Sequence, residues 1–86
     1  MPQVSRFFGI VISMFYDEHN PPHFHVYYGE HTAEIGINDL NVLVGKLPSR
    51  VLGLVIEWAS MHQAELLENW KRIEDGQLLD KIAPLD

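Results

Sequence analysis

The chain has 86 residues, of which 12 are acidic, six are basic and none is cysteine, and its formal net charge is −6. This composition excludes disulfides and thiolate metal sites, and so few cations make extended binding to nucleic acid unfavourable. The sequence contains neither an apolar run near the roughly 20 residues that a membrane helix needs nor a recognisable signal peptide. We therefore expect one domain, residues 1–86, in the cytoplasm and without membrane contact.

The first predicted element is a strand over residues 7–16. Its sequence, FFGIVISMFY, is aromatic, β-branched and almost continuously hydrophobic. This pattern predicts one strand that is buried on both faces and lies in the middle of its sheet. Residues 17–22 contain acidic residues, an asparagine and two prolines, so they are expected to form a loop.

Residues 23–28 and 31–37 are predicted to be the two strands of a hairpin. Gly29 and Glu30 connect them, with glycine first as a type II′ turn prefers. In this register the numbers of opposed residues sum to 59, so His25 lies opposite Glu34. A slip by one residue would mix the apolar face with the polar face. Residues 40–44 are expected to add a short fourth strand.

The C-terminal half is predicted to be helical, since apolar residues recur at three- and four-residue steps from Pro48 to about Glu74. One straight helix of this length would be roughly 40 Å long, which exceeds the width of a compact domain of this size. We therefore expect one long kinked helix or two helices, at about residues 48–60 and 62–75. The capping-box spacing of Ser60 and Gln63 favours a break near Ser60 to His62. Residues 77–86 are expected to form a C-terminal tail.

These elements predict an α+β fold, in which an antiparallel sheet of three to four strands (about 7–16, 23–28, 31–37 and 40–44) packs on the C-terminal helices. The expected core joins apolar residues of the strands to apolar residues of the helices: Ile10, Ile12, Phe24, Val26 and Ile35 with Val51, Leu54, Val55, Trp58, Leu66 and Trp70. The opposite face of the sheet is then expected to present His23, His25, Tyr27 and Glu34.

Residues 17–26, DEHNPPHFHV, contain three histidines within seven residues and are the strongest candidate for a functional site. On an extended strand, His23 and His25 share one face about 7 Å apart, and both rings can tilt towards one ion. Glu34 from the facing strand and His19 from the loop are candidate further ligands. This donor set suits a divalent transition metal such as zinc, manganese or non-haem iron.

Two other interpretations of these residues stay open. Metal-free acid–base chemistry is one, with His19, His23, His25 and Asp17 as the candidate catalytic residues. The other is structural, because a histidine beside a glutamate across a hairpin is an ordinary pair and proline-rich loops use acidic side chains for their own turns.

The sequence resembles a small bacterial family, the domain of unknown function DUF4160. The resemblance covers nearly the whole chain and includes SRFFGIVI at residues 5–12, DEHNPPHFHV at 17–26, GKLP at 45–48 and KIAPL at 81–85. The signature loop of the family falls on His19, Asn20, Pro21, Pro22, His23 and His25. Genes of this family often lie beside those of another small family, so the resemblance implies a two-gene module of the toxin–antitoxin kind.

The first functional hypothesis is therefore a component of such a module that acts through its histidine-rich face. The alternatives are a non-enzymatic protein-interaction module, and a small metal-binding protein that uses His23 and His25 with His19 or Glu34. Whether the protein is an enzyme is left open. The expected partner is a protein encoded by a neighbouring gene or a second copy of the chain.

Overall fold

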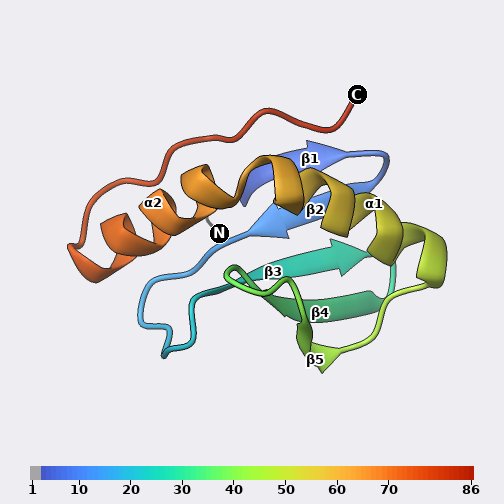
Figure 1. The fold of residues 1–86 in the computed structure, drawn as a ribbon, viewed down its shortest axis with the longest axis horizontal. Helices are drawn as coiled ribbons and strands as arrows, with labels where there is room; N and C mark the ends of the chain where they lie inside the picture. The colour runs from blue at the N-terminus through green and yellow to red at the C-terminus, as the bar shows by residue number, and fades with distance from the viewer. Residues whose placement is uncertain (1–2) are drawn as a thin grey trace.

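The computed structural model describes residues 3–86, which form five strands followed by two helices (Figure 1). The elements are β1 (Gln3–Phe7), β2 (Ile10–Ser13), β3 (His23–Tyr28), β4 (His31–Gly36), β5 (Val42–Gly45), α1 (Ser49–Met61) and α2 (Gln63–Glu74). The strands pair antiparallel in chain order, β1-β2-β3-β4-β5, to give one sheet. The predicted α+β class is confirmed, with one strand more than expected.

The extra strand arises because residues 7–16 do not form a single strand. The chain turns at Phe8 and Gly9, which have φ of 51° and 77°, and Phe7 pairs with Ile10 across the turn. Positive φ at both central residues is the signature of a type I′ hairpin turn. The prediction was wrong here because a large aromatic residue rarely adopts positive φ, so Phe8 gave no signal of a turn.

The β3–β4 hairpin has the predicted register at every pair, including His25 opposite Glu34. Gly29 has φ of 56°, the sign that the first central position of a type II′ turn requires. Phe24 and Val26 are completely buried, as is Ile35 on the facing strand. Alternation along the strands therefore separates the apolar face from the histidine face as expected.

β5 spans Val42–Gly45 and begins two residues later than predicted. The reason is that Leu40 has φ of 57°, which is not a strand conformation. Gly45 ends the strand with φ of 83°, and a Cβ atom at this position would lie 2.2 Å from the carbonyl oxygen of Thr32. Only glycine therefore permits the close approach of β5 to β4 at this point.

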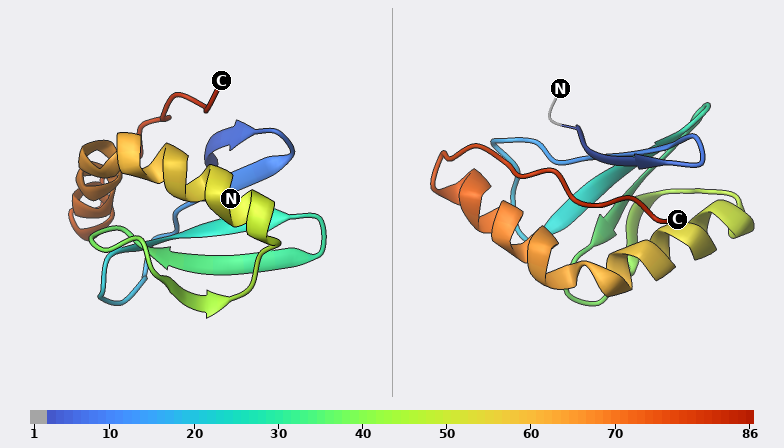
Figure 2. Two further views of the ribbon diagram at one scale, coloured as in Figure 1. Left: turned by 45° about the vertical axis from the view of Figure 1, so that its right-hand side comes forward. Right: turned by 90° about the horizontal axis from the view of Figure 1, so that it is seen from above.

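Both helices lie on one side of the sheet and run in clearly different directions (Figure 2). The longest dimension of the protein is 34 Å, so a single straight helix would extend beyond the sheet. The predicted break is confirmed at His62, but the predicted capping is wrong: the Ser60 hydroxyl donates to the Glu57 carbonyl oxygen at 2.8 Å and does not cap α2. Within residues 3–86, neither helix is long and apolar enough to cross a membrane.

The core lies between α1 and the sheet. The Trp58 ring is 5.5 Å from the Phe7 ring and 6.0 Å from the Phe24 ring, and its indole N–H donates to the Ala83 carbonyl oxygen at 2.8 Å. Every predicted core residue is buried except Leu54, which is partly exposed. Trp58 therefore joins the sheet, α1 and the C-terminal segment.

The C-terminal segment, residues 77–86, returns along the helices to β1 (Figure 1). The backbone N–H of Ile82 donates to the carbonyl oxygen of Val4 at 2.8 Å, and the Ile82 side chain is buried. Lys81 Nζ donates to the carbonyl oxygen of Gln3 at 2.6 Å. The expected tail is thus fastened to its own fold, although Leu78 within it is 88% exposed.

Candidate functional site

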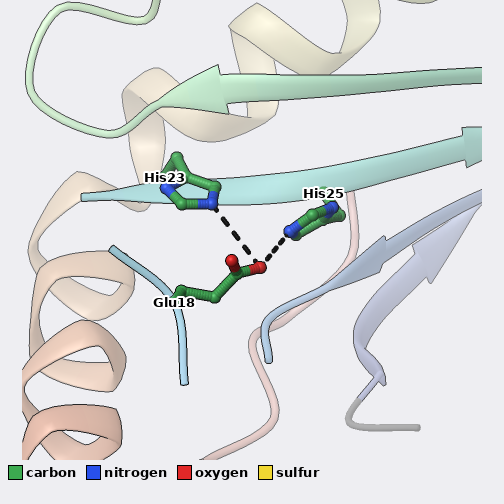
Figure 3. Close-up of side chains that lie close together, drawn as sticks. All are labelled: Glu18, His23 and His25. Carbon is green, nitrogen blue, oxygen red and sulfur yellow. Dashed lines mark hydrogen bonds and ion pairs between the residues drawn. The ribbon is translucent and has the colours of Figure 1, made fainter. Parts of the chain in front are cut away.

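The candidate site lies where β3 begins, between this strand and Glu18 of the loop that connects β2 to β3 (Figure 3). Glu18 from the loop and His23 and His25 from β3 each offer one ligand atom, and these three atoms lie within 4.8 Å of one another. The two histidines share one face of the strand because they are two residues apart. The sequence therefore brings two imidazole nitrogens and one carboxylate oxygen to one point.

His23 is held in one orientation by its own loop. Its side chain is only 6% exposed, and its Nδ1 lies 2.8 Å from the carbonyl oxygen of Pro21. A carbonyl oxygen can only accept, so Nδ1 carries the hydrogen and donates it. In the neutral ring, the lone pair is then on Nε2, the nitrogen that faces Glu18. Fixing one ring nitrogen through a backbone carbonyl is how proteins prepare histidine to bind a metal.

Nε2 of His23 has no hydrogen-bond partner among the described residues, although it is buried. It lies 3.6 Å from Oε1 of Glu18 and 3.6 Å from Oε1 of Glu34. A lone pair that faces two carboxylates is unfavourable, and a buried polar atom without a partner costs free energy. A cation between these atoms, either a proton on Nε2 or a metal ion, removes both costs.

His25 completes the group from the same face of β3. Its Nε2–H donates to Oε1 of Glu18, the atom that also faces His23. The ring of Phe15 packs edge-on against His25 at 4.7 Å, and the ring of Tyr27 stacks on it at 6.5 Å. Donor atoms around a tetrahedral zinc ion are about 3.3 Å apart, given bonds of about 2.0 Å. The 3.6 Å between Nε2 of His23 and Oε1 of Glu18 is close to this spacing.

The site is closed on one side and open on the other. Trp70 from α2 lies 5.2 Å from the His23 ring and is itself buried, so it excludes water from that side. On the outer face of the sheet, a cavity of about 150 Å³ adjoins the site and is lined by His25, Tyr27, Thr32, Ala33, Glu34 and Val44. A small ligand in this cavity would therefore contact His25 and Glu34.

The structure brings together three of the residues predicted for this site: His23, His25 and Glu34. Glu34 pairs with His25 across the strands, as predicted, but its carboxylate faces His23. The other two predicted residues, His19 and Asp17, are exposed and lie outside the group of converging ligand atoms.

Glu18 is the residue that the sequence analysis missed. Loop residues 17–22 lack the period-two pattern of a strand, so nothing in the sequence indicates which of the neighbours Asp17, Glu18 and His19 points inward. The chain turns at Asp17, which has φ of 65°, and Glu18 then reaches the two histidines. The only available signal was its place in the same short acidic and histidine-rich segment, residues 17–26.

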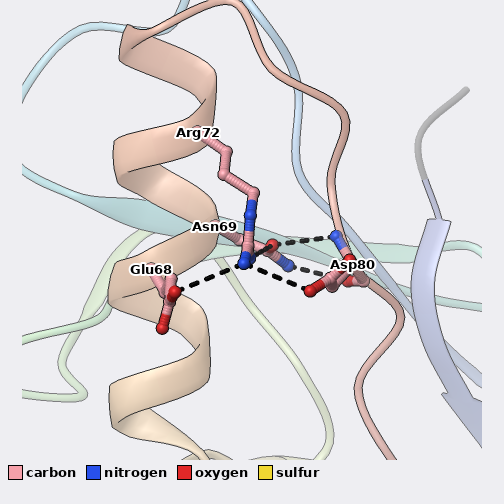
Figure 4. A network of polar contacts seen from close by, with 4 residues as sticks. All are labelled: Glu68, Asn69, Arg72 and Asp80. Atoms are coloured by element: carbon pink, nitrogen blue, oxygen red, sulfur yellow. Dashed lines mark hydrogen bonds and ion pairs between the residues drawn. The ribbon is translucent and has the colours of Figure 1, made fainter.

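A second polar cluster, made by Glu68, Asn69, Arg72 and Asp80, is structural (Figure 4). Asn69 is completely buried; its amide donates to the Asp80 carbonyl oxygen at 2.9 Å and accepts from the Asp80 N–H at 3.0 Å. Arg72 donates to Asn69 at 2.9 Å and pairs with Glu68 and Asp80 at 3.3 and 3.2 Å. Since the Asn69 amide oxygen and nitrogen both have partners, the cluster fastens the C-terminal segment to α2.

The first prediction concerns this fastening. Asn69→Ala should lower the free energy of unfolding by about 2 kcal/mol, because it removes the packing of a completely buried side chain and both of its hydrogen bonds to the Asp80 backbone. Leu78→Ala, at an exposed position of the same segment, is the control and should change it by less than about 0.5 kcal/mol. Urea unfolding measures both. Equal effects of the two substitutions would show that Asn69 does not hold the segment.

The second prediction concerns the histidine ring that faces the carboxylates. In the metal-free protein, Nδ1 of His23 should carry a hydrogen, because the Pro21 carbonyl oxygen can only accept. Long-range ¹H–¹⁵N correlation NMR distinguishes the two ring nitrogens, with the exposed His31 as the reference. A His23 ring that is protonated on Nε2 alone would contradict the geometry.

Comparison with known proteins identifies the same family that the sequence resembles. The family model described as "Domain of unknown function (DUF4160)" matches residues 9–71, which include β2 to β5, α1 and most of α2. No curated protein and no solved structure matches the chain. The matched region covers well over half of the 86 residues and includes Glu18, His23 and His25. The chain belongs to the DUF4160 family.

Proposed function

We propose that this protein binds a divalent transition metal ion, of which zinc is the leading candidate, through His23, His25 and Glu18. The observation that carries the proposal is the buried Nε2 of His23, which faces two carboxylates at 3.6 Å and has no hydrogen-bond partner within residues 3–86. A bound metal ion would occupy this gap and would replace the hydrogen that His25 now donates to Glu18.

The chemistry of the donor atoms supports a transition metal over calcium or magnesium. Two imidazoles and one carboxylate suit zinc and iron, whereas calcium and magnesium prefer oxygen ligands. Glu18 and Glu34 together supply two negative charges, which a divalent cation neutralises. Three protein ligands would leave a coordination position free, as in catalytic metal sites, and a cavity lined by His25 and Glu34 adjoins the site.

A metal centre of this kind is compatible both with catalysis at the histidine-rich face and with a role of this face in binding a partner protein. A metal ion held here with an open position would supply the activation of water that hydrolysis needs, and Glu34, whose carboxylate lies 3.6 Å from Nε2 of His23, would be the nearby base. If the protein is not an enzyme, a metal ion bound by Glu18 would hold the loop of residues 17–22 in one conformation, in which the loop could dock a partner. The toxin–antitoxin-like module stays a prediction that rests on the family resemblance, and the metal proposal does not depend on it.

The third prediction tests the metal site directly. Protein purified without a histidine tag should bind one equivalent of Zn²⁺ in calorimetry. His23→Gln, His25→Gln and Glu18→Gln should each weaken binding by at least about 100-fold, since even the loss of a supporting hydrogen bond costs about 10- to 100-fold. His19→Gln and His31→Gln are matched controls at exposed positions and should leave affinity unchanged.

Two outcomes would contradict the proposal. One is the absence of stoichiometric binding together with no rise in melting temperature when Zn²⁺, Mn²⁺ or Fe²⁺ is added, because a ligand that binds only the folded state must stabilise it. The other is weakening by the exposed-histidine controls as strong as that by the site variants. That result would mean non-specific binding of metal to surface histidines.

The second candidate function is pairing with another protein through β5. This strand is at the edge of the sheet, and its apolar residues Val42, Leu43 and Val44 are between 39% and 57% exposed. Adjacent residues of a strand point to opposite faces, so β5 is accessible on both faces as well as along its edge. An exposed apolar edge strand is a template for strand addition by a partner.

The fourth prediction tests this interaction. When the chain is produced together with the product of the neighbouring gene, the two should co-purify, and Leu43→Lys should abolish the association because it places a charge in the paired edge. Leu67→Lys is the matched control, since Leu67 is 39% exposed on α2. The interaction function fails if neither a complex nor a dimer is seen, or if both lysine variants behave alike.

A further inference from the structure

A groove with a volume of about 320 Å³ lies at the opposite end of β3 from the metal centre. Its lining comes from the β1–β2 turn, from β2, from the end of β3 and from the first turns of α1: Phe8, Ile10, Tyr28, Arg50, Val51 and Leu54. These segments meet where α1 begins over the sheet (Figure 1). The groove shares no residue with the candidate metal site, so a ligand in it would bind whether or not a metal ion is present.

The groove is apolar at its base and along its walls. Ile10 and Val51 are buried and form part of the core, while Tyr28 and Leu54 are partly exposed. Sites for small molecules have volumes of about 300 Å³ and more and are lined mainly by apolar and aromatic side chains. A volume at the lower end of that range suits an apolar group of one or two aromatic rings.

Arg50 is the charged residue in this lining, and it is exposed. Among residues 3–86, the ion pairs involve other side chains, and none includes Arg50. The first turn of α1, to which Arg50 belongs, contains no acidic residue. An unpaired guanidinium at the edge of an apolar groove favours a ligand with a carboxylate, to which arginine donates two parallel hydrogen bonds.

Phe8 has an unfavourable backbone conformation and an exposed apolar side chain, and a bound ligand would remove the second of these costs. Phe8 has φ of 51°, in a turn position where Asn, Asp and Gly are preferred, and its side chain is 60% exposed at the rim of the groove. Backbone conformations of this kind cluster at ligand-binding positions, where the strain serves binding. A bound apolar group would cover the Phe8 ring and the wall formed by Tyr28 and Leu54.

We propose that this groove binds small amphipathic anions, that is, molecules with a compact aromatic or branched aliphatic body and one carboxylate. The apolar body lies against Phe8, Tyr28 and Leu54. The carboxylate pairs with Arg50 at the open end of the groove. The protein as a whole repels anions because its net charge is −6, so the guanidinium of Arg50 is needed to hold the carboxylate at the groove.

The fifth prediction uses 3-phenylpropionate as the probe and its neutral amide, 3-phenylpropionamide, as the matched control. In ¹H–¹⁵N NMR titrations of the full chain, the acid should cause saturable shifts of the backbone signals of Gly9, Tyr28 and Val51. The amide should bind about tenfold more weakly, because it lacks the charge-assisted pair with Arg50.

Two variants separate the apolar contribution from the charged one. Arg50→Gln should reduce the affinity for the acid to that for the amide, whereas Arg6→Gln, at an exposed position outside the groove, should not change it. Phe8→Asn should weaken the binding of both probes and should still fold, because asparagine is favoured in this turn; its melting temperature checks this. The proposal is overturned if no saturable shifts occur near the groove, if acid and amide bind equally, or if Phe8→Asn folds and binds both probes as the native protein does.

Discussion

The pairing of β3 with β4 is the constraint on which both the core and the candidate metal centre depend. The two-residue turn at Gly29 sets the register, and alternation along β3 then sends Phe24 and Val26 into the core and His23 and His25 to the other face. A slip by one residue would exchange these sets. One feature of local backbone chemistry therefore determines the hydrophobic contact with α1 and the placement of both imidazoles.

The environment of His23 is the reason to regard these side chains as a functional site and not as an ordinary hydrogen-bonded pair. The contact between His25 and Glu18 needs no explanation beyond a hydrogen bond. His23 is different, because its Nδ1 donates to the Pro21 carbonyl oxygen, while its buried Nε2 faces carboxylates and has no hydrogen-bond partner in the described part of the chain. Burial of such an atom is unfavourable unless a cation accompanies it. Metal binding is the best-supported function because a metal ion would remove this cost and would also use the convergence of the Glu18, His23 and His25 ligand atoms.

The sequence predicted the β3–β4 register from turn chemistry and strand alternation, and it predicted the break between the helices from the length of the helical pattern. It did not predict the turn at Phe8, because a phenylalanine at positive φ violates local preference, and that violation is where the proposed binding groove lies. It identified His23, His25 and Glu34 because strand alternation places them. It missed Glu18 because an irregular loop has no period from which orientation can be inferred.

Crystallography of the zinc-loaded, tag-free protein, with data collected on both sides of the zinc absorption edge, would show whether Glu18, His23 and His25 hold a metal ion. We expect one anomalous peak that lies about 2.0–2.2 Å from Nε2 of His23, Nε2 of His25 and a carboxylate oxygen of Glu18. A peak only at exposed histidines such as His19 or His31, or no ordered zinc in a crystal grown with saturating metal, would contradict this expectation.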